Sequence, residues 1–474
     1  MAFISSRRGF LIGSALVGAG AAAFLANRFV GDDQFDPSTQ AYLARCESQP
    51  SSLQAAALNA LIVSLKGYGL WDKLDALWDL QAETPQRALL NIKDQKFNLT
   101  LEGNTTHRPG FGLRGDGSTG FLRTGIRPNA GDLVFTLQSA MIGVFCAINT
   151  NGGNSYALGA IDGNLRLKTR QVPAEAPSGF LNDEGAPLNG PPMSGLLPGL
   201  VILNREASYS VSVVKNGMRL VSETRPATQL MDDEILIGRA GSRFSEETYA
   251  FAFVGGGLDE GEMRAFNAVV RDYLIASMTP IVCFGDSLTQ GVRNRGRSPL
   301  ATTTSYPSQL EALQNRVVFN GGIGGQTSIQ IRERAEPDNF MNAAVNIIWM
   351  GRNNYKDTDR VLADIESVAN RVVGGRFAVL SILNGDYPPE HKDLDGYKII
   401  MGLNDTLSKR YGDKYIDVRS QLLAAANPND PGDMADIADD VPPRSLRSDQ
   451  LHLNDAGDTV IAKTVSEFLK KKGW

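Results

Sequence analysis

The run "CFGDSLTQG", residues 283–291, passes from apolar residues into small polar ones, and Ser287 stands at the change. A serine hydroxyl attacks a carbonyl efficiently when a base takes its proton, an acid orients that base, and hydrogen-bond donors stabilise the oxyanion. Three histidines are available as the base, namely His107, His391 and His452. The chemistry of Ser287 therefore depends on which histidine can reach it.

The C-terminal segment "SDQLHLNDAG" places Asp449 three residues before His452. In a turn, this spacing lets the carboxylate bind one imidazole nitrogen while the other nitrogen faces a serine. His107 lies in a strand-rich region and His391 in the polar loop "YPPEHKDLDG", and neither has a carboxylate at a comparable offset on the catalytic side. We therefore predict a triad of Ser287, His452 and Asp449.

Buried strands must position these residues, and the chain after Pro280 has the pattern for them. The apolar segments "IVCF", "RVVFN", "NIIWM", "FAVLSIL" and "YIDV" alternate with helical segments such as "VLADIESVANRVV". This alternation predicts an α/β fold, in which helices cover both faces of a parallel sheet. Catalytic loops of such sheets lie at the carboxyl ends of the strands, and Ser287 directly follows the first strand.

Four blocks of residues 280–474 occur in an order that resembles one superfamily. They are "FGDSLTQG", "NGGIGGQTS", "WMGRNN" and "DQLH", and together they resemble the SGNH (GDSL-type) hydrolases. The resemblance implies a three-layer, flavodoxin-like parallel sheet flanked by helices. It also implies that Ser287 is the nucleophile, that His452 and Asp449 complete the triad, and that the oxyanion hole consists of the Ser287 and Gly325 N–H groups and the Asn353 amide.

Two positions in these blocks fit the family pattern less closely than the rest. "NGGIGG" offers Gly324 as an alternative to Gly325, although the spacing from the preceding asparagine favours Gly325. The family usually has aspartate after the asparagine of the third block, and this chain has Asn354. Because the amide of Asn353 is present, we predict that the change alters the support of the site without abolishing activity.

Other chemistries lack their motifs. The glycine-rich residues 321–325 are followed by neither G-x-G-x-x-G nor a P-loop lysine, and the chain has no G-x-S-x-G elbow. It also has no H-E-x-x-H or comparable ligand cluster. We predict an enzyme that uses neither a cofactor nor a metal ion.

The region before the α/β segment reads as two further parts. Residues 31–89 begin as a polar spacer, and leucines at helical spacing from Ser51 onward, interrupted at residues 67–69, predict a helical hairpin. Residues 90–275 read as an all-β domain, a sandwich or jelly roll of short strands, among them "LVFTL", "GVFCAI", "LRLKT", "YSVSVV", "EILIG" and "TYAFAFVGG".

Two short motifs within the β region predict a particular turn and a helix start. Asn216-Gly217 suits a type I′ hairpin turn, and Asp259 with Glu262 forms a capping box before a closing helix. With "RGDGSTGFLRTG" and "EILIGRAG", these features resemble concanavalin-like jelly rolls that accompany carbohydrate enzymes. The resemblance implies glycan binding, and a purely structural role stays equally open.

Residues 1–30 read as a targeting segment. Ser6 to Leu11, including Arg7-Arg8, resemble a twin-arginine signal, and an apolar run follows them. The resemblance implies the twin-arginine export machinery as a partner and a periplasmic or secreted location. Cleavage near Ala23 or Ala26 is one outcome, an uncleaved inner-membrane anchor is another, and a cytoplasmic protein with an apolar helix is the alternative to export.

The composition of the 474 residues limits the kinds of binding partner and covalent cross-link that the protein can have. The formal net charge is −5, and the only tight basic cluster is Lys470–Lys472, which disfavours nucleic-acid binding. Three cysteines are too few for a disulfide framework, although one bridge between Cys46 and Cys146 is open.

Together these features predict an exported serine esterase with a ping-pong mechanism, whose best substrate is O-acetylated carbohydrate. Lipid or aryl esters are the second choice of substrate. A polysaccharide O-acyltransferase and an inactive glycan-binding protein are the alternative functions.

Overall fold

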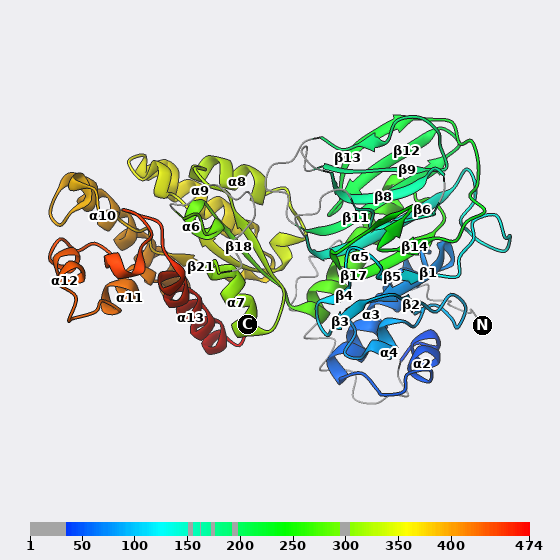
Figure 1. The fold of residues 1–474 in the computed structure, drawn as a ribbon, viewed down its shortest axis with the longest axis horizontal. Helices are drawn as coiled ribbons and strands as arrows, with labels where there is room; N and C mark the ends of the chain where they lie inside the picture. The colour runs from blue at the N-terminus through cyan, green and yellow to red at the C-terminus, as the bar shows by residue number, and fades with distance from the viewer. Residues whose placement is uncertain (1–34, 150–154, 162, 172–175, 192–197, 294–303) are drawn as a thin grey trace, which may run out of the picture.

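A computed structural model describes residues 35–149, 155–161, 163–171, 176–191, 198–293 and 304–474. An N-terminal domain of antiparallel sheets lies beside a C-terminal α/β domain, and helix α5 (Glu260–Met278) leads from one to the other (Figure 1). The predicted twin-arginine signal lies outside the described residues. Among the described helices, none is long and apolar enough to cross a membrane.

The predicted helical hairpin is wrong in its second half. Helices α2 (Pro37–Leu43) and α3 (Ser52–Gly67) form, but residues 74–79 are strand β1 (Leu74–Asp79), which pairs with β17 (Thr248–Gly255). All six residues of β1 are buried, with Leu77 in one hydrophobic core and Trp78 in another. Since both faces are covered, the alternating polar pattern of a strand is lost, and the leucine spacing imitates a helix.

Two antiparallel sheets make up most of the N-terminal domain. The first has the order β13-β12-β11-β6-β17-β4-β3, with β1 beside β17, and the second has the order β10-β9-β8-β7-β14-β5-β2. The first contains β3 (Thr105–Arg108), β4 (Gly112–Gly115), β6 (Ala140–Ile148), β11 (Gly199–Ala207), β12 (Ser210–Lys215) and β13 (Met218–Thr224). The second contains β2 (Thr100–Glu102), β5 (Phe121–Arg123), β7 (Leu158–Gly159), β8 (Leu165–Gln171), β9 (Ala176–Leu181), β10 (Leu188–Asn189) and β14 (Leu236–Ile237).

Side chains from both sheets share one apolar core, which includes Ile142 and Val213 from the first sheet and Leu167 and Ile237 from the second. A small hairpin of β15 (Arg239–Ala240) and β16 (Arg243–Phe244) and the short helix α4 (Pro85–Ala88) complete the domain. The predicted sheet-rich domain is therefore present, and its concanavalin-like jelly-roll type stays a prediction.

The turn and cap predictions in this domain are confirmed. Asn216 and Gly217 have φ values of 47° and 85° between the paired strands β12 and β13, as a type I′ turn requires. Asp259 and Glu262 form a capping box at the start of α5.

The predicted strand "LVFTL" is wrong, because residues 133–137 form no strand. The backbone N–H groups of Val134 and Phe135 donate to the Asp75 carboxylate at 2.8 and 2.9 Å instead of to a neighbouring strand. Strand β11, in contrast, is present and was missed.

The C-terminal domain has the predicted α/β fold. Its parallel sheet has the order β19-β18-β20-β21-β22. The strands are β18 (Ile281–Gly285), β19 (Val318–Gly322), β20 (Val345–Trp349), β21 (Phe377–Leu380) and β22 (Tyr415–Ile416). The helices are α6 (Ser287–Gln290), α7 (Tyr306–Gln314), α8 (Ser328–Ala335), α9 (Thr358–Arg371), α10 (Asp395–Tyr411), α11 (Val418–Ala424), α12 (Pro431–Ala438) and α13 (Asp455–Lys472).

Alternation along β18 accounts for the three layers. Val282 and Phe284 lie in the core shared with α8, α9 and α10, whereas Ile281 and Cys283 lie in the core shared with α7, α11 and α13. Both faces of the sheet are thus covered by helices, and its loops at the carboxyl edge remain available for a site.

The two domains meet through apolar and polar contacts. The Phe145 ring of β6 lies 4.7 Å from that of Phe340 and 6.4 Å from that of Phe319, measured between ring centroids. Beside them, the Asn216 amide donates to the Asp338 carboxylate at 3.1 and 3.2 Å. One hydrophobic core therefore continues from the β domain into the α/β domain.

Candidate active site

Ser287 lies in a tight turn where β18 gives way to α6. Asp286 caps this short helix by accepting a 3.0 Å hydrogen bond from the Leu288 N–H. A Cβ at Gly285 would lie 2.0 Å from Oγ1 of Thr289 and 2.6 Å from the carbonyl oxygen of Trp349, so glycine is required there. The turn holds Ser287, which is 8% exposed, at the carboxyl edge of the sheet.

The structure brings together the three residues predicted as a triad. Oγ of Ser287 lies 2.9 Å from Nε2 of His452, and Nδ1 of His452 lies 2.8 Å from Oδ2 of Asp449. When Nδ1–H donates to the carboxylate, Nε2 is left to accept the proton of the serine hydroxyl. The geometry is that of a nucleophile, a general base and the carboxylate that orients the base.

Asp449 is held by its own turn. Its Oδ1 accepts hydrogen bonds from the backbone N–H groups of Leu451 at 2.8 Å and His452 at 2.7 Å. Partial burial acts to raise the pKa of this carboxyl, but these two bonds and the imidazole of His452 bring the net pKa below its ordinary value. Asp449 is therefore ionised at neutral pH and can stabilise an imidazolium.

The glycine loop after β19 lies beside Ser287, since a Cβ at Gly324 would be 3.7 Å from the Ser287 Cβ. The Gly324 N–H already donates to Oε1 of Gln290 at 2.7 Å. No hydrogen bond of the Gly325 N–H is found within the described part of the chain, and Gly325 has a φ of 79°. This arrangement favours Gly325 over Gly324 as the oxyanion donor.

Asn353 extends from the third loop to the same place. Its Nδ2 donates to the carbonyl oxygen of Gln326, the residue after Gly325, at 2.8 Å. An amide nitrogen has two hydrogens, so this bond fixes the group and leaves a second N–H for a ligand.

Asn354, where the chain departs from the family, faces a different group. Its Oδ1 accepts from the Ser328 N–H at 3.0 Å, and its Nδ2 donates to Oγ of Ser328 at 2.9 Å. Ser328 Oγ in turn donates to buried Asp364 at 2.7 Å. Asn354 thus ties the third loop to the start of α8.

Two arginines that sequence reasoning missed, half-buried Arg334 and buried Arg352, hold the loops together. Arg334 donates to the carbonyl oxygens of Gly285 and Gly321 and to Oε1 of Gln326, so it links the loops after β18 and β19. Burial lowers its pKa to about 10, which leaves it cationic at neutral pH. Arg352 donates from Nη2 to both Glu390 oxygens at 2.9 Å.

Asp286 is a third residue that the sequence did not single out. Burial raises the pKa of its carboxyl to about 6, although the Leu288 N–H and the nearby charges of Arg352 and His452 oppose that effect. Its position directly before Ser287 was the only available signal. Asp286 therefore adds a titrating group at the edge of the site.

The Ser287 hydroxyl is hydrogen-bonded to His452 and to neither of the other two histidines. His107 lies on β3, where burial lowers the pKa of its imidazole. His391 has no carboxylate at the three-residue offset that Asp449 has from His452, as the sequence indicated, but its Nε2 lies 3.0 Å from Asp386 and its Nδ1 lies 3.5 Å from Asp439. The chain folds over this loop and brings Asp439 to it from a distant turn.

Within the described ranges, no group of three or more histidine, cysteine, aspartate or glutamate side chains is placed to hold a metal ion. Cys46, Cys146 and Cys283 are unpaired, so the bridge between Cys46 and Cys146 is not formed.

The family model of GDSL-like lipases/acylhydrolases matches residues 283–460. The chain therefore carries a GDSL/SGNH lipase-acylhydrolase domain at its C-terminal end. A tail spike protein of Salmonella phage epsilon15 is 29% identical over an alignment of 143 residues, and the match covers 27% of this chain and 13% of that protein. The chain thus spans only a small part of this curated relative.

Solved structures include partial matches to the chain. A lipase/acylhydrolase from Enterococcus faecalis is 15% identical, and the match covers 41% of this chain and 96% of that chain with a TM-score of 0.31. An acetylxylan esterase from Geobacillus stearothermophilus is 17% identical, with 41% and 94% covered and a TM-score of 0.30.

Proposed function

We propose that this protein is an exported serine esterase that hydrolyses acyl esters, chiefly acetyl esters, on carbohydrate. The observation that carries the proposal is the continuous hydrogen-bonded series from Ser287 through His452 to Asp449, which lies beside the glycine loop and Asn353. Acyl transfer requires a nucleophile, a base and oxyanion donors, and this arrangement supplies each of them.

In the first half-reaction, Oγ of Ser287 attacks the ester carbonyl as its proton passes to Nε2 of His452. The Ser287 and Gly325 N–H groups and the Asn353 amide stabilise the tetrahedral oxyanion. The C–O bond to the alcohol then breaks, and the alcohol oxygen takes the proton from His452. An acyl-serine remains.

In the second half-reaction, His452 takes a proton from water, and the resulting hydroxide attacks the acyl-serine. Collapse of the second tetrahedral intermediate breaks the bond to Oγ, which recovers its proton from His452. The carboxylic acid leaves, and the free enzyme is restored. Asp449 stays ionised throughout and stabilises the imidazolium in both halves.

Carbohydrate is the proposed alcohol component because of the domain that accompanies the hydrolase. The concanavalin-like motifs "RGDGSTGFLRTG" and "EILIGRAG" lie in a two-sheet domain. That domain shares a hydrophobic core with the catalytic one, so the two form a continuous structure. A polymer held by the first could thus present its esters to the second.

A substrate panel tests the proposal. It compares acetyl, butyryl and long-chain esters of one chromogenic alcohol with acetylated polysaccharides, using the full chain, Ser287→Ala and the exposed control Ser222→Ala. We expect the acetyl ester and an acetylated polysaccharide to be the best substrates, and only Ser287→Ala to abolish turnover. A preference for long acyl chains would indicate a lipase instead.

Acetate release in the absence of any sugar acceptor separates a hydrolase from an O-acyltransferase. Turnover that requires an acceptor hydroxyl would assign the transferase. Tight glycan binding without turnover of any ester would assign an inactive glycan-binding protein.

Export is a separate part of the proposal, and it rests on the twin-arginine pattern at Arg7-Arg8. Changing both arginines to lysine should retain the protein in the cytoplasm, whereas the unchanged chain should reach the periplasm. An unchanged periplasmic yield of the variant would rule out this route. Mass spectrometry of the exported N-terminus would distinguish a cleaved signal from a membrane anchor.

A further inference from the structure

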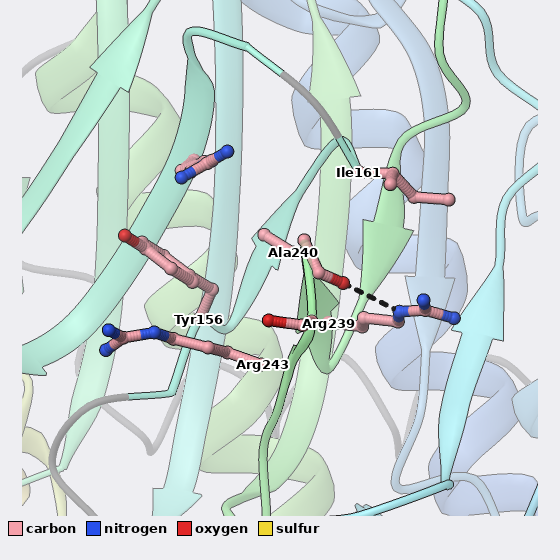
Figure 2. A pocket seen from close by; sticks show the side chains of 8 residues that line it. Tyr156, Ile161, Arg239, Ala240 and Arg243 are labelled. Atoms are coloured by element: carbon pink, nitrogen blue, oxygen red, sulfur yellow. Dashed lines mark hydrogen bonds between the residues drawn. The ribbon is translucent and has the colours of Figure 1, made fainter.

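A pocket of about 500 Å³ lies in the N-terminal domain. Its lining comes from Tyr156, Ile161, Arg166 on β8, and the β15–β16 hairpin at residues 239–243 (Figure 2). The hairpin packs closely on the second sheet, since a Cβ at Gly159 would lie 2.9 Å from the Ala240 Cβ. The volume falls within the range of about 300–1,000 Å³ that small-molecule sites occupy.

Positive charge gathers around Tyr156. The Arg166 guanidinium lies 5.5 Å and the Lys168 ammonium 4.9 Å from the centre of the Tyr156 ring. Arg243 extends on the same side of the cavity as Tyr156 (Figure 2). Burial lowers the pKa of Lys168, Tyr156 opposes this effect, and Arg243 adds to it.

The described lining residues include no aspartate or glutamate. Nε of Arg166 is buried and has no hydrogen-bond partner in the described part of the chain.

Arg239 has a different role from the other arginines. Its Nε donates to the Gly241 carbonyl oxygen at 3.0 Å, and its guanidinium stacks between the Phe121 and Phe244 rings at 4.8 and 4.7 Å. It points away from Tyr156 and Arg243 (Figure 2). Arg239 therefore stabilises the hairpin. The cationic cluster consists of the lining residues Arg166 and Arg243 and of Lys168, which is buried beside Tyr156 and does not itself line the pocket.

We propose that this cluster binds the carboxylate of an acidic sugar unit within a polysaccharide. Guanidinium groups match the planar carboxylate and bind it through charge-assisted hydrogen bonds. Tyr156, the aromatic side chain of the lining, supplies an apolar ring against which a sugar ring can pack.

A single carboxylate group suits the site better than a densely charged nucleic acid. The cluster has three cations, whereas the whole chain has a formal net charge of −5, so its field favours anions only locally. Binding at the cluster is independent of the proposed function. The further idea that the bound polymer carries the ester attacked by Ser287 rests on that function.

The test measures binding of the full chain to polygalacturonate by isothermal titration calorimetry, beside dextran sulfate, neutral dextran and duplex DNA. We expect polygalacturonate to bind best and its affinity to fall as salt is added. Arg243→Gln and Arg166→Gln should each weaken binding about 10-fold or more, because each removes a charge-assisted hydrogen bond.

Arg219→Gln is the matched control, because Arg219 is an exposed arginine on β13, in the other sheet. Its affinity should equal that of the unchanged chain. The proposal is overturned if polygalacturonate does not bind, if dextran sulfate or DNA binds more tightly, or if the control loses as much affinity as the cluster variants. Since Arg243 is exposed, Arg243→Gln gives this result even if Arg166→Gln fails to fold.

Hydrolysis of a small aryl acetate by the same preparation reports separately on the proposed esterase. A chain that binds polygalacturonate through the cluster but leaves the ester intact would contradict the esterase and support the sugar site. A chain that hydrolyses the ester but does not bind polygalacturonate would support the esterase and contradict the sugar site.

Discussion

In the α/β domain, Ser287, Gly325 and Asn353 all follow parallel strands of one sheet, whereas in the β domain the cationic cluster lies partly within a strand and partly on a hairpin. Parallel strands end at a common edge, so side chains after successive strands converge whatever their distance along the chain. In an antiparallel sandwich, register and the placement of loops decide which side chains meet. The first kind of site is therefore encoded by motifs, and the second by packing.

The largest expected effect concerns the motif-encoded site. Ser287→Ala should lower kcat/KM on a short acyl ester by about 10⁴-fold or more, because it removes the covalent route. Steady-state kinetics of the purified variant measure this loss, with Ser222→Ala as the matched control. A reduction of less than about 10-fold would show that the reaction does not pass through Ser287.

The second prediction concerns the boundary between the two regions. Phe340→Ala should lower the free energy of unfolding by about 3–5 kcal/mol, since it leaves a cavity against Phe145. Because the core is continuous, denaturant unfolding should show one transition by both fluorescence and circular dichroism. Leu313→Ala, an exposed site on α7, should change stability by less than about 0.5 kcal/mol. Two separated transitions in the unchanged chain would mean that the domains unfold independently.

The third prediction addresses the loop where the chain departs from the family. Asn353→Ala should lower kcat by about 10²–10³-fold with little change in KM, because the lost contact forms mainly in the transition state. Asn354→Ala should cost much less, since its hydrogen bonds go to Ser328. A severe loss at Asn354 with a mild loss at Asn353 would place the oxyanion hole one residue later.

The smallest effect expected concerns pH. The pKa of Asp286 is raised by burial to about 6 from an ordinary 3.8, so the folded chain holds this proton more tightly than the unfolded chain. That stabilisation is present below about pH 4 and is lost as the pH rises through about 6. Relative to Asp286→Asn, the unchanged chain should lose about 2–3 kcal/mol of stability between pH 4 and pH 7.

Urea unfolding of both proteins across this pH range gives the difference directly. A difference that stays constant, or that moves in the opposite direction, would contradict the assignment of the buried carboxyl.

Sequence patterns predicted the elements whose burial is regular. The strand before Ser287 and the turn at Asp449 and His452 were predictable because local spacing determines them. β1 was not, because burial of both of its faces removes the alternation that distinguishes a strand from a helix. Arg334 was not predictable either, since its partners Gly285 and Gly321 meet it only in the folded sheet.

The pocket in the N-terminal domain was also only partly predictable from sequence patterns. Arg166 and Lys168 are two residues apart on β8, which predicts a common face. Arg243 joins them only because the β15–β16 hairpin folds back over the sheet. No local pattern encodes that approach, so this site could be found only in the folded structure.

Covalent labelling with a fluorophosphonate, followed by mass spectrometry of the digested chain, tests the central claim most directly. Such a reagent reacts with a serine whose hydroxyl is activated by a base. The account predicts a single adduct on the peptide that contains Ser287, and much slower labelling in His452→Ala. Labelling of another residue, no labelling, or an equal rate in His452→Ala would contradict it.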